Sequence, residues 1–483
     1  MSELHTFAGL GVPSSIADAL ELLGITTPTP IQEATLPDSI SGRDVLGRGR
    51  TGSGKTYAFL LPIITHIITD RYRPAPGSPR ALILAPTREL VSQIEESLQP
   101  LKKIAKFTSF TIFGGVGQGP QVRAVNRGLD IAIATPGRLE DLMRQGEIDL
   151  SQIETVVIDE ADQMADMGFL PIVTKILNQV PRDAQHLLFS ATLDKQVKTL
   201  VNRFLTNPVT HEADSPEDTE AAHLQMAHHA LRVSHEDKPG VIADLCAAPS
   251  RAIVFARTKH GARNLSRKLT KMGVPALELH GNLSQNARMR NLNAFHDGKV
   301  STLVATDIAA RGIHVDDVEI VIHADPPAEH KAYVHRSGRT ARAGNSGVVV
   351  TIVRKDQVKD VKSLMGKAGV HAEWANATPE SDLLFDLAPG GREFLDRSIA
   401  ERMVQDVIPS KPSGGGGRGQ KRSKGQGGKR NGGFHKSNKT QSKAHKAKSK
   451  HGGGKPHRHE GTGTGPGAHQ NSRSKTVLLK THA

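Results

Sequence analysis

The chain has almost no cysteine and no long apolar run. One cysteine, Cys246, stands among 483 residues, so no intramolecular disulfide can form and a reducing compartment is indicated. The longest apolar stretch, around "YAFLLPIITHIIT", contains Pro62 and His66 and is too short to span a bilayer. The first residues, "MSELHTFAGLGVPSS", have neither the basic nor the apolar region of a secretion signal. We therefore expect a cytoplasmic protein without a membrane partner.

Acidic residues are scarce at one end of the chain. Residues 411–483 contain 18 Lys and Arg but one acid, Glu460, a net charge of +17, whereas the preceding 410 residues carry −3. This segment is rich in Gly, Ser and His and has one aromatic residue, Phe434, so we expect it to be disordered. The asymmetry indicates a polyanionic partner, although a tail that only keeps the chain in solution is the alternative.

The body of the chain alternates short apolar runs with segments of helical length. Runs such as "ALIL", "IAIA" and "TVVI" are typical of strands buried on both faces of a parallel sheet, joined by crossover helices. The acidic segment "HEADSPEDTEAAH" favours a linker at 210–221 between domains at 1–209 and 222–375, each with five or six strands. One large sheet is the alternative, but the linker would have to cross it. Residues 376–410 stay unassigned, although "GREFLDRSIAERM" favours a short helix.

The stretch "GRTGSGKT" matches the phosphate-loop pattern G-x-x-x-x-G-K-[ST] in full. It follows the short apolar run "DVLG" and precedes an apolar helical run, which is the context that the pattern requires. Backbone N–H groups of such a loop converge on phosphate oxygens, its lysine reaches the β- and γ-phosphates, and its hydroxyl ligates magnesium. A Gly-rich turn with an incidental lysine is the alternative. The residues predicted to hold ATP and Mg²⁺ are Gly49, Arg50, Thr51, Gly52, Ser53, Gly54, Lys55 and Thr56.

Three carboxylates, Asp159, Glu160 and Asp162, directly follow the apolar run "TVVI". Carboxylates suit the positive end of a helix dipole, so a helix start is the simple explanation. With a phosphate loop in the same chain, however, Asp159 is expected to hold magnesium and Glu160 to orient and deprotonate the attacking water. Asp162 is expected to pair with a neighbouring basic residue.

The stretch "HRSGRTARAG" places an arginine at every third position. On a helix, Arg336, Arg339 and Arg342 would face roughly one way. We predict that Arg339 and Arg342 bring positive charge to the γ-phosphate from the second domain. A basic helix face that binds nucleic acid directly is the alternative.

Together the motifs resemble those of the DEAD-box ATP-dependent RNA helicases, in particular the bacterial type with a basic Gly/Lys-rich tail. The resemblance covers about residues 5–355, where "TPTPIQ", "TGSGKT", "PTREL", "TPGR", "DEAD", "SAT", "IVFARTK", "HGNLSQNAR", "ATDIAARG" and "HRSGRTAR" stand in the family's order. It implies an α/β fold of two tandem RecA-like domains and the cofactors ATP and Mg²⁺. It also implies local unwinding of short RNA duplexes, or remodelling of ribosomal or messenger ribonucleoprotein, with the tail tethering RNA.

The resemblance implies further roles for single residues. Gln32 would read the adenine edge, Phe7 is an implied nucleotide-binding residue, and His314 stands where the family has an acid that contacts the ribose. Contacts to phosphates would suit a chain with only 17 aromatic residues for stacking on bases. The implied RNA-backbone contacts are Arg88, Gly115, Thr135, Arg138, Arg288 and Thr306, and the implied coupling residues are Ser190, Thr192 and His335.

Two other functions are compatible with parts of this pattern. In a non-catalytic RNA clamp or annealing chaperone, the tail would do the work, but the intact Lys55, Asp159, Glu160, Arg339 and Arg342 argue against lost catalysis. A DNA helicase on the same fold is the second alternative, and the "TPTPIQ" and "DEAD" spellings favour RNA by resemblance. No segment is typical of a dimerisation helix, so the sequence leaves the oligomeric state open.

Overall fold

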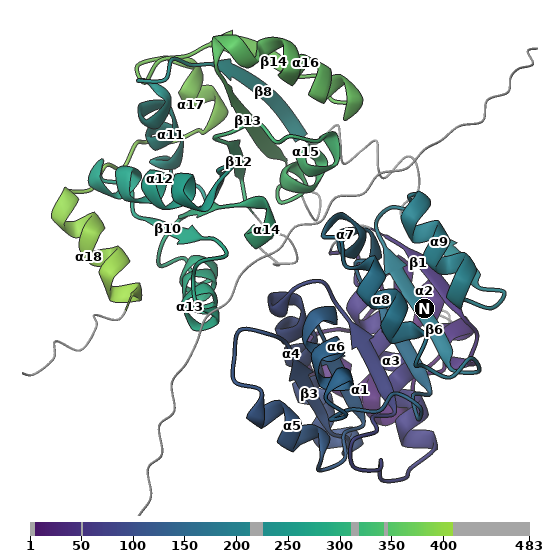
Figure 1. The fold of residues 1–483 in the computed structure, drawn as a ribbon. Helices are drawn as coiled ribbons and strands as arrows, with labels where there is room; N and C mark the ends of the chain where they lie inside the picture. Colours follow the sequence, from purple (N-terminus) through teal and green to yellow (C-terminus); the bar gives the residue numbers. More distant parts are fainter. Residues whose placement is uncertain (1–4, 50–51, 213–225, 311–317, 342–345, 409–483) are drawn as a thin grey trace, which may run out of the picture. The chain divides into compact units, whose positions relative to one another are not determined.

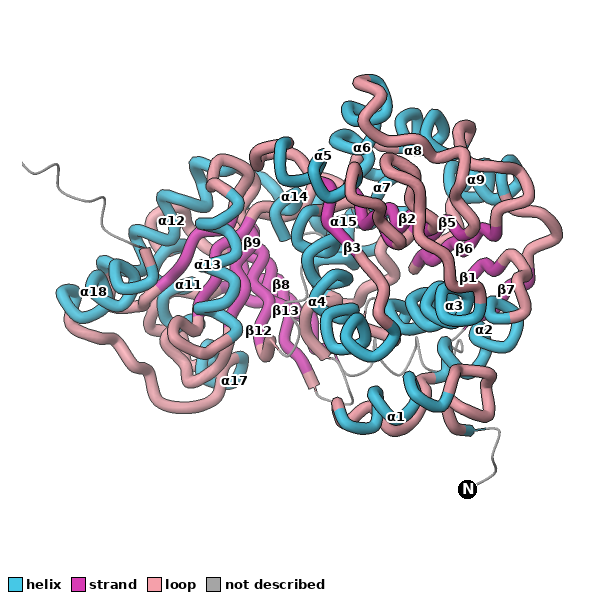
Figure 2. The backbone as a smooth tube through the Cα atoms, turned by 90° about the horizontal axis from the view of Figure 1, so that it is seen from below, coloured by secondary structure: helices cyan, strands magenta, loops and turns pink. Residues whose placement is uncertain are grey.

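The computed structural model describes residues 5–49, 52–212, 226–310, 318–341 and 346–408. Two parallel sheets, each with helices on both faces, make up this part of the chain (Figure 1 and Figure 2). Among these residues, no helix has the length and apolar composition needed to cross a membrane. The predicted α/β fold with two tandem RecA-like domains is therefore confirmed.

The first sheet has seven parallel strands in the order β3-β4-β2-β5-β6-β1-β7. The strands are β1 (Val45–Arg48), β2 (Ala81–Leu84), β3 (Ser109–Ile112), β4 (Ile131–Ala134), β5 (Thr155–Ile158), β6 (Gln185–Ser190) and β7 (Val209–Glu212). The helices are α1 (Ser14–Leu22), α2 (Pro30–Ile40), α3 (Lys55–Thr69), α4 (Arg88–Ala105), α5 (Gly119–Val125), α6 (Pro136–Arg144), α7 (Ala161–Asp166), α8 (Leu170–Leu177) and α9 (Lys195–Phe204).

Both faces of the first sheet are buried. Successive residues of a strand point to opposite faces, so Ile83 and Val157 pack with α1 to α4, whereas Leu82 and Val156 pack with α5 to α9. This explains the unbroken apolar runs of β2, β4 and β5, because neither face of these strands meets water.

The second sheet repeats this arrangement, with the order β10-β11-β9-β12-β13-β8-β14. Its strands are β8 (Met226–Arg232), β9 (Ala252–Phe255), β10 (Ala276–Leu279), β11 (Thr302–Ala305), β12 (Ile320–His323), β13 (Gly347–Val353) and β14 (Glu373–Asn376). Its helices are α11 (Lys238–Cys246), α12 (Lys259–Lys271), α13 (Gln285–His296), α14 (Asp307–Ala310), α15 (His330–Ser337), the 3-10 helix η2 (Lys355–Gln357), α16 (Val358–Lys367), α17 (Leu383–Leu387) and α18 (Arg397–Val407). Subtracting seven from each strand number reproduces the order of the first sheet.

The segment left unassigned by the sequence belongs to the second domain. Leu384 and Leu387 of α17 are buried in its core, and α18 packs against α12. Arg392, between these helices, is mostly buried and makes an ion pair of 2.8 Å with Asp244 of α11. The helix predicted within "GREFLDRSIAERM" begins at Arg397, where the Asp396 carboxylate accepts a hydrogen bond from Ser398 N.

Two details differ from the sequence prediction. Each sheet has seven strands instead of five or six, because β7, β8 and β14 were missed. The linker predicted for 210–221 begins inside β7, which pairs with β1, and residues 213–225 lie outside the described residues. Residues 409–483, which include the basic tail, also lie outside them.

Cys246 is buried, and burial raises the pKa of its thiol to about 12, so this thiol is not poised for chemistry.

Candidate functional site

The phosphate loop connects the end of β1 with the start of α3. Gly52 and Gly54 have φ angles of 90° and 93°, a conformation that other residues rarely adopt. A Cβ atom on Gly54 would overlap Thr29 Oγ1 and lie 2.8 Å from Gln32 Nε2, so only glycine fits there. The buried hydroxyl of Ser53 has no hydrogen-bond partner among the described residues, a polar atom that a ligand at this loop would satisfy.

Lys55, the first residue of α3, lies at the centre of the charged groups. Its Nζ donates to the Gly49 carbonyl at 2.8 Å and to Glu160 Oε1 at 3.0 Å. Burial alone would lower the pKa of Lys55, but the charges of Glu160 and Asp159 outweigh it, so the pKa is raised. Burial alone would raise the pKa of Glu160, and Lys55 together with Arg339 and His335 lowers it instead. Lys55 is therefore a cation and Glu160 an ionised carboxylate at neutral pH.

The two acids that follow β5 are held in different ways. Asp159 is 3% exposed, and its Oδ1 accepts a hydrogen bond of 3.0 Å from Glu160 N. Glu160 has a φ angle of 53°, which is unusual for a residue with a side chain and precedes the first turn of α7. This turn of the backbone directs the Glu160 carboxylate to Lys55.

The predicted magnesium ligands fit that ion. Mg²⁺ prefers oxygen ligands and is usually bound through one or two carboxylates together with substrate phosphates. Asp159 offers a carboxylate at the end of β5, and Thr56 offers a hydroxyl in the first turn of α3. The described ranges contain no group of three or more His, Cys, Asp and Glu side chains that could hold a metal ion by themselves.

Asp162 contacts the stretch "SAT" and not the basic partner that the sequence predicted. Its Oδ2 accepts hydrogen bonds of 2.9 Å from both the backbone N and the hydroxyl of Thr192. The Ser190 hydroxyl accepts from Asp162 N at 3.2 Å. The predicted coupling residues Ser190 and Thr192 are thus bonded to the same helix start as Glu160, on which hydrolysis is predicted to depend.

Gln32 supports the loop with both ends of its amide. Its Nε2 donates to the Gly54 carbonyl at 2.8 Å, and its Oε1 accepts from Thr29 N at 2.9 Å, which forms a capping box for α2. Phe7 is 3% exposed and packs in the core of the first domain. The structure therefore joins Gln32 to the phosphate loop, while Phe7 lies in the hydrophobic core, and a nucleotide contact by either residue stays a prediction.

Arg336 and Arg339 of "HRSGRTARAG" do not share a helix face, so the prediction was wrong for these two, and Arg342 lies outside the described residues. Helix α15 ends at Ser337, because Gly338 follows and glycine is a poor helix former. Arg336 is 2% exposed and pairs with Asp307 through Nε and Nη2, the latter at 2.7 Å. Arg339 lies beyond the helix end and lines a pocket with His335, Phe255 and Asp307. The positive charge of Arg339 is one of the causes that lower the pKa of Glu160.

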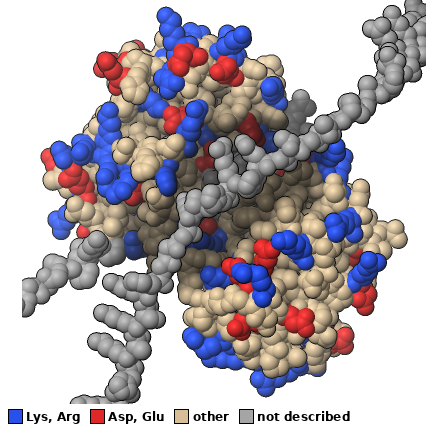
Figure 3. All heavy atoms as spheres, viewed as in Figure 1, with Lys and Arg blue, Asp and Glu red and all other residues tan. Residues whose placement is uncertain are grey.

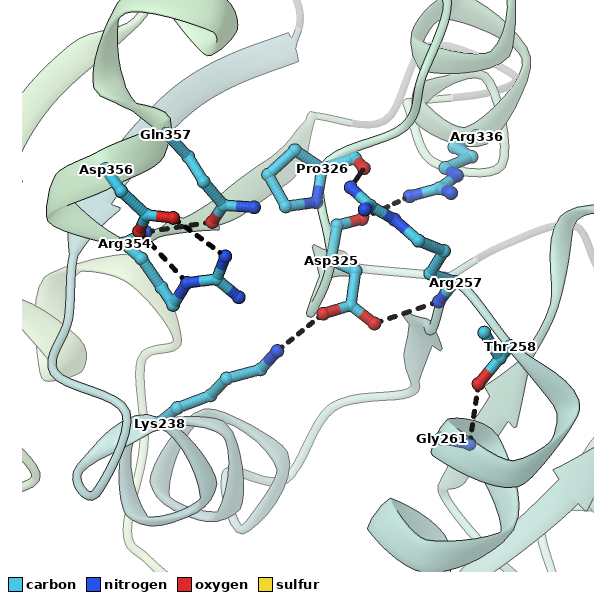
Figure 4. A network of polar contacts seen from close by, with 10 residues as sticks. All are labelled: Lys238, Arg257, Thr258, Gly261, Asp325, Pro326, Arg336, Arg354, Asp356 and Gln357. Carbon is cyan, nitrogen blue, oxygen red and sulfur yellow. Dashed lines mark hydrogen bonds and ion pairs between the residues drawn. The ribbon is translucent and has the colours of Figure 1, made fainter.

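A network behind α15 holds Arg336 in place (Figure 4). Its Nη1 donates to the Asp325 carbonyl at 2.7 Å. The Asp325 carboxylate in turn accepts from Lys238 Nζ at 2.7 Å and from Arg257 N at 2.9 Å. Burial alone would raise the pKa of Asp325, but the Arg257 N–H and Lys238 outweigh it, so the pKa is lowered.

The four predicted RNA contacts of the first domain are Arg88, Gly115, Thr135 and Arg138. The Arg88 guanidinium packs against Gly115, whose φ of 80° and lack of a Cβ atom make room for it. Arg138 donates to the Val116 carbonyl at 3.4 Å, and Thr135 immediately precedes the first turn of α6. Burial and the charges of Arg288 and Arg138 lower the pKa of Arg88, although Glu89 opposes them. Two arginines near a helix N-terminus form a site suited to phosphate.

Arg288, also predicted to contact RNA, is used differently. Its Nε donates to Glu89 Oε1 at 2.6 Å and its Nη2 to the Ala309 carbonyl at 3.1 Å. Gln285 donates to the same carboxylate at 3.1 Å. Glu89 is not among the residues predicted from the sequence, although its place within "PTREL" is a signal. Thr306 lies at the end of β11, where its carbonyl accepts hydrogen bonds from Ala309 N and Ala310 N, so it begins α14.

A second ion pair that the sequence did not indicate joins α15 to the start of α9. Lys331 Nζ lies 2.7 Å from Asp194 Oδ2, and Asp194 also caps α9 through hydrogen bonds from Gln196 N and Val197 N. Four predicted site residues, Arg50, Thr51, His314 and Arg342, lie outside the described residues.

The fold and this site define a protein of the RecA-like class with a phosphate loop in its first domain. A DEAD/DEAH box helicase model matches residues 29–200, and a helicase conserved C-terminal domain model matches residues 237–344. The chain is 37% identical over 380 residues to ATP-dependent RNA helicase DBP2 of Chaetomium thermophilum, covering 77% of this chain and 68% of that protein. It belongs to the DEAD-box ATP-dependent RNA helicase family.

Further relatives agree with this assignment. DEAD-box ATP-dependent RNA helicase 53 of Oryza sativa subsp. japonica is 39% identical over 359 residues, which cover 74% of this chain and 59% of that protein. S. cerevisiae Dbp5 bound to RNA and ADP BeF3 superimposes with a TM-score of 0.68 at 27% identity, covering 83% of this chain and all of that one. The chain spans only 51% to 59% of the length of the first relatives it matches, which are plant proteins.

Proposed function

We propose that the chain is an RNA-stimulated, Mg²⁺-dependent ATPase that locally unwinds short RNA duplexes or remodels ribonucleoprotein. The observation that carries this proposal is the buried contact of 3.0 Å between Lys55 and Glu160, with Asp159 beside it and Arg339 close enough to lower the pKa of Glu160. A cation and an ionised base thus lie at the carboxyl ends of β1 and β5, where α/β sheets bind ligands.

The residues at this site divide the chemistry of hydrolysis among them. A nucleotide phosphate at the loop would compete with Glu160 for Lys55 and leave the Glu160 carboxylate to accept a proton from water. Magnesium, held by Thr56 and Asp159, would supply charge that neutralises the phosphates. Arg339 and His335, from the second domain, would add positive charge where negative charge develops.

Coupling of hydrolysis to RNA would run through Asp162 and Lys331. Asp162 follows Glu160 closely in α7 and bonds to Thr192, and Lys331 pairs with Asp194, two residues after Thr192. On the RNA side, Arg88, Arg138 and the start of α6 would bind the phosphate backbone without reading bases.

Other parts of the proposal rest on the sequence. The net charge of +17 in residues 411–483 supports a tail that tethers RNA with strong salt dependence. The Gly/Lys-rich composition of this tail also supports grouping the chain with the bacterial members of the family. The same composition supports ribosomal or messenger ribonucleoprotein as the partner of the chain. The single, buried cysteine supports a cytoplasmic location.

The test is steady-state ATP hydrolysis by the full chain without nucleic acid, with single-stranded RNA, and with DNA of matching sequence. We expect strong stimulation by RNA alone. Glu160→Gln should lower the RNA-stimulated kcat by about 10²–10⁴-fold, the usual contribution of a general base, while nucleotide binding persists.

The control is Glu140→Gln, a surface carboxylate of the first domain that pairs with Lys175. It should hydrolyse ATP at the wild-type rate. Low hydrolysis that RNA fails to stimulate would contradict the proposal and favour an RNA clamp. Equal stimulation by DNA would favour the DNA helicase.

A further inference from the structure

Helix α12 carries a row of positive charge that the proposed site does not use. The helix has five Lys and Arg residues and no Asp or Glu. Lys259, Arg263, Arg267 and Lys271 follow one another at intervals of four residues, a spacing that aligns side chains along one side of a helix, and Lys268 lies beside them. All five are exposed, and Figure 3 shows Lys and Arg side chains gathered over the region where Figure 1 places α12. We call these five residues the α12 row.

No carboxylate in the described part of the chain neutralises the α12 row. Lys259 donates to the Asn282 side chain at 3.0 Å, and the other four make no ion pair with any side chain in the described part of the chain. Helix α4 differs, since its Lys102 is paired with Glu95. Like charges at four-residue spacing repel each other and weaken a helix. The helix persists because its opposite face buries Ala262, Leu269 and their neighbours in the core.

The shape and composition of the row indicate the kind of ligand. From Lys259 to Lys271 the helix rises by about 18 Å, at about 1.5 Å per residue. A nucleic-acid duplex presents a regular line of phosphates over such a length, with roughly one negative charge per 1.7 Å of axis. The helix has no Phe, Tyr or Trp, so His260 and the arginine guanidinium groups are its only side chains on which unpaired bases could stack. Recognition through the backbone of a duplex suits these features better than recognition of a single strand.

The elements around α12 leave the row open. Helix α18 packs against α12, yet the five cations stay exposed. Leu395 N donates to the Gly273 carbonyl at 3.0 Å, so the segment before α18 passes the end of α12. Lys411, the first cation of the tail, comes only four residues after Val407, the end of α18.

We propose that the α12 row is a second RNA-binding surface, which holds the phosphate backbone of double-stranded RNA next to the strand that the helicase motifs bind. This inference rests on the proposed RNA helicase function and adds a surface of which only Lys259, the last residue of "IVFARTK", belongs to a motif. Its purpose is to keep a duplex at the enzyme while a neighbouring strand is released.

The test uses the full chain with Arg263, Arg267 and Lys271 each replaced by Gln. Glutamine is a good helix former and removes only the charge. Binding of a short RNA duplex is measured by fluorescence anisotropy over a series of salt concentrations without nucleotide. The logarithm of the binding constant should fall less steeply with the logarithm of the salt concentration. The slope should change by about 3, because each of the three lost phosphate contacts contributes about 0.9. The kcat of ATP hydrolysis with saturating single-stranded RNA should stay at the wild-type value.

Two controls separate this surface from general loss of charge. Lys355→Gln, Lys359→Gln and Lys367→Gln remove the same charge from exposed positions on η2 and α16 of the same domain and should leave the slope near the wild-type value. Replacing Arg263 and Arg267 by Lys keeps the charge and should keep the slope.

An unchanged slope for the α12 variant, or an equal change for the η2 and α16 variant, would overturn the inference. The proposed function is judged separately, because it is tested by whether RNA, and not DNA, stimulates hydrolysis by the wild-type chain.

Discussion

The two sheets have the same strand order but differ at the strand that precedes the phosphate loop in the first. In the first sheet β1 is followed by a loop with Gly49, Gly52 and Gly54, and α3 begins at Lys55. In the second sheet the equivalent strand is β8, and α11 begins at Lys238 after five residues without glycine. Both lysines are the first residue of the helix that follows.

The partners of the two lysines are also equivalent in position. Lys55 pairs with Glu160, which follows β5, and Lys238 pairs with Asp325, which follows β12. The carboxylate of Asp325 is occupied by Lys238 and by Arg257 N, whereas the loop before Lys55 bends back in a conformation that only glycine tolerates well. One topology thus carries a lysine available to phosphate in the first domain and a lysine used for structure in the second.

The largest expected difference between the two domains is in catalysis. Lys55→Ala should lower kcat/KM for ATP by about 10²–10³-fold, as expected when one preorganised electrostatic group is lost. Lys238→Ala should leave the KM for ATP unchanged and lower the free energy of unfolding by about 1–2 kcal/mol, since it removes a partly buried charged hydrogen bond. Steady-state kinetics and urea denaturation of both variants measure these effects. A loss of activity in Lys238→Ala as large as that in Lys55→Ala would refute the distinction.

The residues before the two helices should differ by a smaller amount. Gly54 has a φ angle of 93°, and the equivalent residue before α11, Asp237, has a φ angle of −77°. Gly54→Ala forces a left-handed conformation that costs about 1–2 kcal/mol. The added Cβ atom would also crowd Gln32, which should shift the loop. Because about 1.4 kcal/mol corresponds to a factor of ten, the KM for ATP should rise by about tenfold or more. Asp237→Ala removes the hydrogen bond that Ser234 donates to Asp237, but this variant should hydrolyse ATP at the wild-type rate. Equal KM values for ATP in the Gly54→Ala and Asp237→Ala variants would disprove the contrast.

The smallest expected effect is on the pH dependence of stability. The pKa of Asp325 is lowered in the folded protein, so its contribution is present above the unfolded value of about 3.9 and is lost as the pH falls through the folded value. Asp325→Asn should therefore be less stable than wild type at neutral pH, and the gap should narrow as the pH falls below about 4. Thermal unfolding across this pH range tests the prediction. A gap that stays constant would mean that the carboxylate charge is not responsible.

Much of the fold could be predicted from the sequence because the central strands are buried on both faces. Unbroken runs such as those of β4 and β5 are apolar for local reasons that the sequence displays directly. The missed strands β7 and β14 have polar or exposed residues at most positions. They are strands because they pair with β1 and β8, and pairing between distant segments leaves no local pattern.

The site was predictable to the extent that its chemistry depends on neighbouring residues in the chain. The loop from Gly49 to Thr56 and the acids after β5 were found because spacing alone identifies them. The partners of Asp162 and Arg288 were not found, because Thr192 and Glu89 are 30 and 199 positions away from them. Gly338 in "HRSGRTARAG" indicates a helix end, whereas the three-residue spacing of the arginines favours a helix that continues. The structure agrees with Gly338, since α15 ends at Ser337.

The sequence by itself determined the α/β class, the phosphate loop and the two acids after β5, since these follow from local apolarity, backbone conformation and the spacing of adjacent residues. Only the tertiary structure decided that Arg339 lowers the pKa of Glu160, that Arg336 is bound to Asp307, and that Lys238 is held by Asp325. Those pairings depend on which strand ends meet at one edge of a sheet, and the order of strands in a sheet is not the order of strands in the chain.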